Sequence, residues 1–278
     1  MRIEWSLVFF SLFAGLAAGV FTGIAVSEWS DRAERIRFKG ALLTLAALII
    51  SGCSSVLHLG HPERIFGALK HPESGIFLEA LFMGLFGLMV VLYLLALRRE
   101  TPGLLSKLIA TLGTIPAVLL AFAVGYTYMM PSRPAWDSWI LPLLYLASAA
   151  VMGCFCIAAL LADDEHEEYP DSAALTKTSL MFLGIQAILI MAYIGYLGNA
   201  PYPAASRSLT RLLMGDLGPL FWIGLVLLGF LVPFIIMLRA KKSESLSEIR
   251  YGLMCVLMAG IAFRALMFSL GSAVRNFF

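Results

Sequence analysis

Long apolar stretches separated by short polar segments run through the whole chain. A helix needs about 20 apolar residues to cross the hydrocarbon core of a membrane. Eight stretches have this length, at about 7–27, 40–60, 75–97, 108–130, 139–162, 178–198, 217–239 and 250–273. None shows the strict alternation of a transmembrane barrel strand. The pattern therefore predicts an all-α integral membrane protein, a bundle of eight transmembrane helices that forms a single domain over residues 1–278.

The composition agrees with this pattern. Of the 278 residues, 60% are hydrophobic and 14% are charged, and the mean hydropathy is +0.87. A soluble domain is usually about half apolar and about a quarter charged, so water is not the main solvent of this protein. The apolar residues extend over the whole length, which favours neither a cleavable signal peptide nor a separate soluble domain. With a net charge of +2, we expect membrane lipid and other proteins as partners, and no nucleic acid.

The basic residues predict how the bundle is oriented. Twelve Lys and Arg residues fall in the segments 28–39, 98–107, 163–177 and 239–250, whereas the opposite side holds seven. Short cytoplasmic loops are the ones enriched in Lys and Arg. We therefore expect a multi-pass protein of the cytoplasmic (inner) membrane with both termini outside the cytoplasm. The acidic run 163–168 then faces the cytoplasm, as a solvated loop or, alternatively, as a metal site.

The outward segments and the cysteines allow further expectations. Prolines stiffen the outward segments 60–64, 131–136 and 199–203, and aromatic residues lie near the same boundary. These aromatics form either an ordinary interfacial belt or a rigid docking surface for another protein. The four cysteines all fall inside apolar stretches without the spacing of a metal motif, so we expect packing residues and no metal site in this protein.

Three ionisable residues lie within the predicted spans, namely His58, Glu79 and Arg264. Charges inside a bilayer are costly and usually functional. All three fall in the outward half of the membrane, and each needs a partner that offsets its desolvation. They are therefore predicted to share one polar site. The alternative is structural, with an interfacial histidine that bonds to a backbone carbonyl and a carboxylate that either extends to the membrane surface or pairs with Arg64 or Arg264.

A histidine and a carboxylate at one depth form a suitable pair for accepting protons near neutral pH. This is the chemistry that a quinol requires, because it sheds two protons as it loses two electrons. A haem between two histidines of facing helices is a competing possibility. Only His58 of the four histidines lies within a predicted span, which argues against such a bis-histidine haem and leaves a haem with one ligand or with a methionine ligand as the alternative. We therefore expect no haem and direct electron transfer to the cofactor of a partner protein.

Several segments resemble the membrane-anchor subunit of dimethyl sulfoxide reductase, the DmsC family, along nearly the whole sequence. The segments that carry the resemblance are 4–7, 57–66 with Ser74 and Glu79, Tyr128 with 134–138, and Arg264 in the last helix. The segment 57–66 is the most specific of these. A glutamate that commonly precedes the last-helix arginine is absent from 258–264, which puts any role of that acid in doubt.

The resemblance implies that this protein anchors two hydrophilic subunits. One is a polyferredoxin-like subunit with iron–sulfur clusters, and the other is a catalytic subunit with a molybdopterin cofactor. The anchor would bind and oxidise menaquinol through His58, Arg64, Glu79, Tyr128 and Arg264. His58 and Glu79 would accept the protons, whereas Arg64 and Arg264 would steady the negative charge on the quinol oxygen. Related anchors serve reductases for different acceptors, so the terminal acceptor stays open.

Two other functions are compatible with the residues. A secondary transporter could use His58, Glu79 and Arg264 as its substrate site, although such sites typically lie near the midplane on interrupted helices. A passive anchor without quinone chemistry would retain the same residues for structural reasons.

Overall fold

The computed structural model describes residues 3–29, 36–58, 71–98, 103–162, 172–243 and 248–271. Over these residues the ordered elements are α1 Trp5–Trp29, α2 Arg37–His58, α3 Gly75–Leu97, α4 Leu104–Tyr126, α5 Ile140–Leu161, α6 Ser172–Asn199, α7 Pro203–Leu213, η3 Leu220–Leu231, α8 Val232–Ser243 and α9 Ile249–Leu270. Eight helices of this part are long and apolar enough to cross a membrane, with η3 and α8 together forming the seventh. The predicted all-α bundle of eight spans is confirmed.

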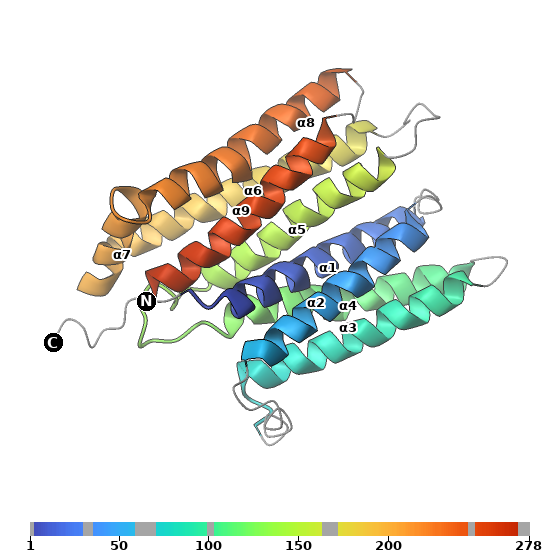
Figure 1. Ribbon diagram of the computed structural model, residues 1–278, viewed down its shortest axis with the longest axis horizontal. Coiled ribbons are helices and arrows are strands. Elements are labelled where there is room, and N and C mark those ends of the chain that lie inside the picture. The colour runs from blue at the N-terminus through green and yellow to red at the C-terminus, as the bar shows by residue number, and fades with distance from the viewer. Residues whose placement is uncertain are drawn as a thin grey trace.

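The spans form two groups of four that lie side by side (Figure 1). The first group contains α1 to α4, and the second contains α5, α6, the η3–α8 helix and α9. In each group the first helix packs against the second and the fourth. Two glycines, Gly19 of α1 and Gly153 of α5, join the groups. A Cβ atom on Gly19 would lie 2.0 Å from the carbonyl oxygen of Ala149, so this close approach of two helix backbones requires glycine.

Burial separates central helices from peripheral ones. Of the span windows of α1, α5 and α9, 67% is buried, whereas only 22% is buried in α3 and α6. The exposed side chains of the peripheral helices are mostly large and apolar, as expected for a surface that faces lipid. Side chains of α3 that point towards α1 and α4 are therefore buried in the protein core, whereas the other side chains of this helix face lipid.

The seventh span contains a π-helical segment that the sequence pattern did not indicate. In η3 the backbone hydrogen bonds run between residues five apart, which brings Gly224 and Gly229 onto nearly the same face. A Cβ on these glycines would lie 2.6 Å from Ala262 and 2.9 Å from Ala259 of α9. The wider turn thus lets both glycines contact α9.

Helix α7 is a second feature absent from the prediction, which treated this segment as a loop. It is too short to span a membrane, and it closes the end of α9. Ser208 Oγ donates a hydrogen bond to the carbonyl of Leu270 at 3.0 Å, and Arg211 Nη1 donates to the carbonyl of Ser269 at 3.0 Å. These bonds satisfy carbonyls that a helix end leaves without internal partners.

The predicted limits of the spans shift by a few residues, most at the sixth, which begins at Ser172 instead of about residue 178. The fourth helix ends at Tyr126 instead of about residue 130, which leaves Tyr128 in the connection to α5. All four cysteines are free. Cys156 is buried as predicted, but Cys53 is exposed on the apolar outside of α2 and is not a packing residue.

Candidate functional site

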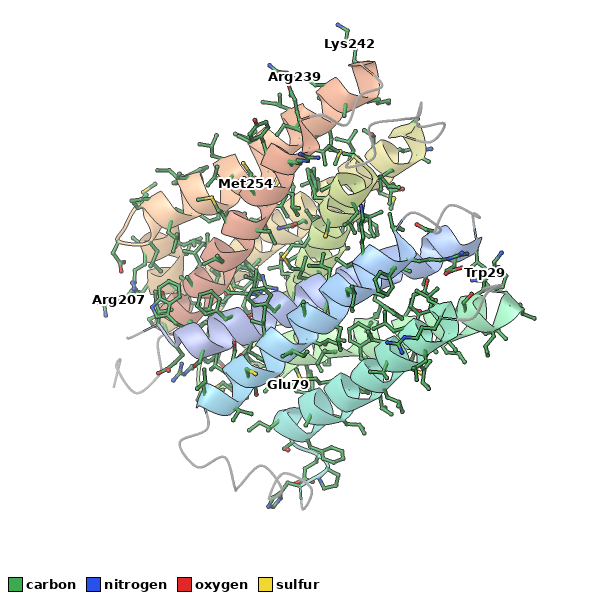
Figure 2. All side chains as sticks on the ribbon, turned by 45° about the vertical axis from the view of Figure 1, so that its right-hand side comes forward. Trp29, Glu79, Arg207, Arg239, Lys242 and Met254 are labelled. Atoms are coloured by element: carbon green, nitrogen blue, oxygen red, sulfur yellow. The ribbon has the colours of Figure 1, made fainter. Side chains whose placement is uncertain are left out.

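Four of the predicted site residues, His58, Glu79, Tyr128 and Arg264, come to one end of the bundle, where α2, α4 and α9 end and α3 and α5 begin. His58 is the last residue of α2, but its side chain lies outside the described part of the protein, as does all of Arg64. Glu79 lies in the second turn of α3 at this end (Figure 2).

The start of α3 is held tightly against the end of α4. Ser74 caps the helix, since its hydroxyl accepts a hydrogen bond from the backbone N–H of Phe77 at 3.2 Å. A Cβ on Gly75 would lie 2.5 Å from Oγ1 of Thr127, so the first turn packs directly on this connection. Glu79, one turn further, adjoins Thr127. Its Oε1 atom is buried and has no hydrogen-bond partner among the residues that the structure describes.

Arg264 of α9 is fully buried at this end of the bundle. Its Nη1 donates to the carbonyl of Gly260 at 3.0 Å and to Oγ of Ser148 at 3.4 Å, and its Nη2 donates to the carbonyl of Ser11 at 3.0 Å. The guanidinium carbon lies 5.3 Å from the ring centre of Tyr145, within the range of a cation–π contact. The guanidinium of Arg264 thus donates hydrogen bonds to three helices, α1, α5 and α9.

The structure does not join Arg264 to Glu79. Within the described residues, no ion pair links the two side chains, so the alternative of a structural Glu79–Arg264 pair is wrong. The Nε atom of Arg264 also has no hydrogen-bond partner in this part of the protein. Each of the two residues thus keeps one open polar atom.

Tyr128 and Tyr145 are both in electrostatic range of Glu79 and Arg264. Their ring centres are 6.2 Å apart, and Tyr145 is buried with a hydroxyl that has no partner in the described structure. Burial raises the pKa of the Tyr128 hydroxyl well above its usual value, Tyr145 and Glu79 raise it further, and Arg264 opposes them. The hydroxyl of Tyr128 therefore stays protonated, and both Glu79 and Arg264 lie within electrostatic range of it.

We name Glu79, Tyr128, Tyr145 and Arg264 the Glu79 cluster. Its open polar atoms are Glu79 Oε1, Tyr145 Oη and Arg264 Nε, defined by the absence of a partner among the described residues. Buried polar groups usually find partners, so these three atoms at one end of the bundle are candidates for contacts with a polar ligand. The sequence did not reveal Tyr145, because a tyrosine in an apolar helix resembles an ordinary core residue.

A second buried cluster lies at the opposite end, near Trp29 (Figure 2). Glu28 of α1 is fully buried. Arg37 donates from Nε to its Oε1 at 2.9 Å and from Nη2 to its Oε2 at 3.1 Å, and the Tyr93 hydroxyl donates to Oε1. We name these residues the Glu28 cluster. The sequence interpretation missed it, because it placed residue 28 in a loop instead of the last turn of α1.

Two hydrogen bonds hold the connection between α4 and α5 in place at the end of the bundle that contains the Glu79 cluster. The hydroxyl of Tyr193 donates to the carbonyl of Ala135 at 2.5 Å, and Nε1 of Trp136 donates to the carbonyl of Met267 at 2.7 Å. Trp136 is thus a buried anchor, whereas Trp139, 63% exposed, suits an interfacial belt. The aromatic residues of this rim therefore have two different roles.

Metal ligands do not gather in the described part of the protein, where no three His, Cys, Asp or Glu side chains could hold an ion together. The acidic run 163–168 lies outside the described residues, so a metal site there stays an open alternative.

Eight spans with a buried, partly unsatisfied polar cluster at one end define a multi-pass membrane protein with a candidate ligand site at that end. The sequence matches the polysulphide reductase NrfD family over residues 1–274, and the chain belongs to this family. Over 194 residues, 68% of either sequence, it is 26% identical to the C component of the anaerobic dimethyl sulfoxide reductase of Haemophilus influenzae. It is 25% identical to the C component of the selenate reductase of Mesobacillus selenatarsenatis, covering 91% of this sequence and 72% of that one. The resemblance seen in the sequence is confirmed.

Proposed function

We propose that this protein is the membrane subunit of a reductase complex, in which it binds and oxidises a quinol, menaquinol by preference. The electrons pass to a docked iron–sulfur subunit and from there to a molybdopterin catalytic subunit. The family, together with relatives named as components of a dimethyl sulfoxide and a selenate reductase, supports this assignment. The observation that carries the quinol site is the open Oε1 atom of Glu79, buried beside Tyr128 at one end of the bundle.

The chemistry follows from the oxidation of a quinol, which releases two electrons and two protons. Glu79 Oε1 accepts a hydrogen bond from one hydroxyl and then its proton, since no described residue competes for this oxygen. His58, at the end of the neighbouring α2, accepts the second proton. Arg64 and Arg264 steady the negative charge that develops on the quinol oxygen. The electrons leave directly to a cluster of the docked subunit, because a quinol at the rim is close to any partner bound over that end.

The position of the cluster favours this role over a transporter. Glu79 is four residues from the start of α3, or about 6 Å at a rise of about 1.5 Å per residue. A secondary transporter typically holds its substrate near the midplane on interrupted helices. A site this close to one end suits a lipid-soluble substrate that exchanges electrons with a docked protein.

The same proposal includes the orientation, with both termini and the Glu79 cluster outside the cytoplasm. Protons from the quinol then appear on the side where a reductase docked at this end consumes them, so that no net charge crosses the membrane. Single cysteines at Ser132 and Lys242, both exposed and at opposite ends, test it. Ser132→Cys should react with a membrane-impermeant reagent in intact cells, and exclusive reaction of Lys242→Cys would reverse the orientation.

The proposed function is tested on the purified complex. Iron and molybdenum should accompany the protein, and Glu79→Gln should lower quinol-dependent turnover about 10²–10⁴-fold, the usual contribution of a general base. Turnover with a reduced viologen dye, which feeds the hydrophilic subunits directly, should not change. Glu73→Gln is the matched control, because Glu73 is an exposed carboxylate at the same end. Normal quinol oxidation by Glu79→Gln, or a protein that purifies without metal-bearing partners, would contradict the proposal.

Haem is expected to have no part in this electron transfer. Reduced-minus-oxidised spectra of the isolated subunit should lack cytochrome b bands. A stoichiometric band that disappears in His58→Ala would instead show that His58 is a haem ligand.

A further inference from the structure

The hydroxyl of Tyr145 differs from those of the other deeply buried tyrosines. Tyr93 donates to Glu28, and Tyr193 donates to the carbonyl of Ala135. Tyr145 is equally buried, 2% exposed, but its hydroxyl is one of the open polar atoms of the Glu79 cluster. Buried tyrosines usually find a hydrogen-bond partner, so a group outside the described residues is expected to supply one.

Arg264 narrows the chemistry of that group. Its guanidinium lies against the ring of Tyr145, and its Nε is also an open polar atom. The guanidinium has little freedom to turn, because both Nη atoms are bonded and a Cβ on Gly15 would lie 3.0 Å from Nη2. An arginine Nε–H can only donate. A partner for Arg264 Nε must therefore accept a hydrogen bond, as an oxygen can.

Glu79 and Tyr145 lie at similar depth from the same end of the bundle. Tyr145 is five residues from the start of α5, or about 7.5 Å, compared with about 6 Å for Glu79 in α3. Tyr128 is in ring contact with Tyr145, and Glu79 is in electrostatic range of both tyrosines. The open polar atoms are thus a hydrogen-bond acceptor on α3 and hydrogen-bond donors on α5 and α9.

A quinol carries two oxygens on opposite sides of one ring, so that one can donate a hydrogen bond to Glu79 Oε1 while the other accepts from Tyr145 and Arg264. We propose that Tyr145 is an additional quinol-binding residue, whose hydroxyl, supported by Arg264 Nε, donates a hydrogen bond to the oxygen far from Glu79. This inference rests on the proposed quinol oxidation. It assigns Glu79 to proton removal and Tyr145 to holding the ring in place. A substitution of Glu79 should therefore lower turnover, whereas a substitution of Tyr145 should raise the KM for quinol.

Tyr145→Phe tests this assignment in the intact complex, since it removes the hydroxyl and leaves the ring. The KM for a short-chain naphthoquinol should rise about 3- to 10-fold, the range of one net hydrogen bond. Because no described internal bond is lost, the midpoint of thermal unfolding should stay or rise, and viologen-driven turnover should not change. Tyr193→Phe is the matched control, since its hydroxyl bonds to the protein itself. It should lower the unfolding midpoint and leave the KM for quinol unchanged.

Three results would contradict the quinol-binding role of Tyr145 or the proposed quinol oxidation on which it rests. An unchanged KM in Tyr145→Phe, while Glu79→Gln is inactive, would mean that internal water occupies this place, and only the inference fails. A lower unfolding midpoint in Tyr145→Phe, together with a loss of viologen activity, would show a structural role for the hydroxyl. Normal quinol kinetics in both variants would contradict the proposed function as well.

Discussion

The Glu79 and Glu28 clusters place similar side chains at opposite ends of the same bundle. Each contains a carboxylate, an arginine and at least one tyrosine. In the Glu28 cluster both carboxylate oxygens accept hydrogen bonds, and Arg37 donates one to each in a bidentate arrangement. In the Glu79 cluster the carboxylate and arginine do not meet, and three polar atoms stay open among the described residues.

This difference separates a structural group from a binding group. Burying a charge is unfavourable unless good geometry offsets the desolvation, and the Glu28 cluster achieves this internally, tying α1, α2 and α3 together. The Glu79 cluster offsets the desolvation of its charges only in part, and a ligand oxygen would supply a hydrogen-bond partner for its open polar atoms. We therefore expect substitutions at one end to change stability and substitutions at the other end to change quinol chemistry.

The largest effect is expected for His58→Ala. The variant loses the second proton acceptor of the proposed site, so quinol-dependent turnover should fall about 10²–10⁴-fold, while the unfolding midpoint stays close to that of the wild type. Leu57→Ala is the control, because Leu57 is adjacent and 81% exposed. Equal turnover of the two variants would remove His58 from the site.

The Glu28 cluster should respond in the opposite way. Arg37→Leu leaves Glu28 buried without its bidentate partner, and breaking a buried pair from one side typically costs about 3–5 kcal/mol. The unfolding midpoint of the complex should fall accordingly, with an unchanged KM for quinol in the assembled fraction. The double variant Glu28→Gln/Arg37→Leu should recover part of the loss. A stable Arg37→Leu complex with defective quinol oxidation would reverse the roles of the two clusters.

Arg264 is expected to show an intermediate effect, because it belongs to the site and also bonds to the backbone. Its Nη atoms donate to carbonyls of α1 and α9, a geometry that a lysine ammonium cannot reproduce. Arg264→Lys should therefore lower the stability by about 1–3 kcal/mol, the cost of leaving buried groups unsatisfied. Arg264→Leu should impair quinol turnover about as much as Arg264→Lys. Near-normal behaviour of Arg264→Lys would show that only the charge matters.

The smallest effect is expected for the exposed pair Arg211–Asp216 of the α7 region. Hydrogen bonding from Arg211 lowers the pKa of Asp216, so the stabilisation is present above the usual carboxylate pKa and is lost as the pH falls through the lowered value. Asp216 is 60% exposed, and such pairs contribute at most about 1 kcal/mol. Thermal unfolding of Asp216→Asn should differ slightly from wild type at pH 7 and converge with it below about pH 4.

The spans could be predicted because the thickness of the bilayer imposes their length. Glu79 and Arg264 were predictable for a related reason, since charged residues within apolar stretches are rare and need an explanation. The π-helical turn of η3 was not predictable, because it depends on how Gly224 and Gly229 meet the alanines of α9. Helix α7 was missed because the search for spans ignores short amphipathic helices.

The geometry of both clusters required the structure. Periodicity places Tyr145 and Tyr93 on apolar helices but does not say that one hydroxyl is bonded and the other is open. Similarly, the pairing of Glu28 with Arg37 depends on where α1 ends and α2 begins, and a shift of two residues in the predicted end of the first helix moved Glu28 into a loop. Sequence therefore located Glu79 and Arg264, whereas the other members of the two clusters and all their partners depend on the packing.

Photoaffinity labelling tests most directly whether quinol binds at the Glu79 cluster. An azido-naphthoquinone would be activated by light on the purified complex, and the labelled peptides would be identified by mass spectrometry. We expect label on the first two turns of α3 and α5 and the connection around Tyr128, and competition by unlabelled naphthoquinol. Competed label on peptides that contain Glu28 or Tyr93, with none near Glu79, would contradict the account.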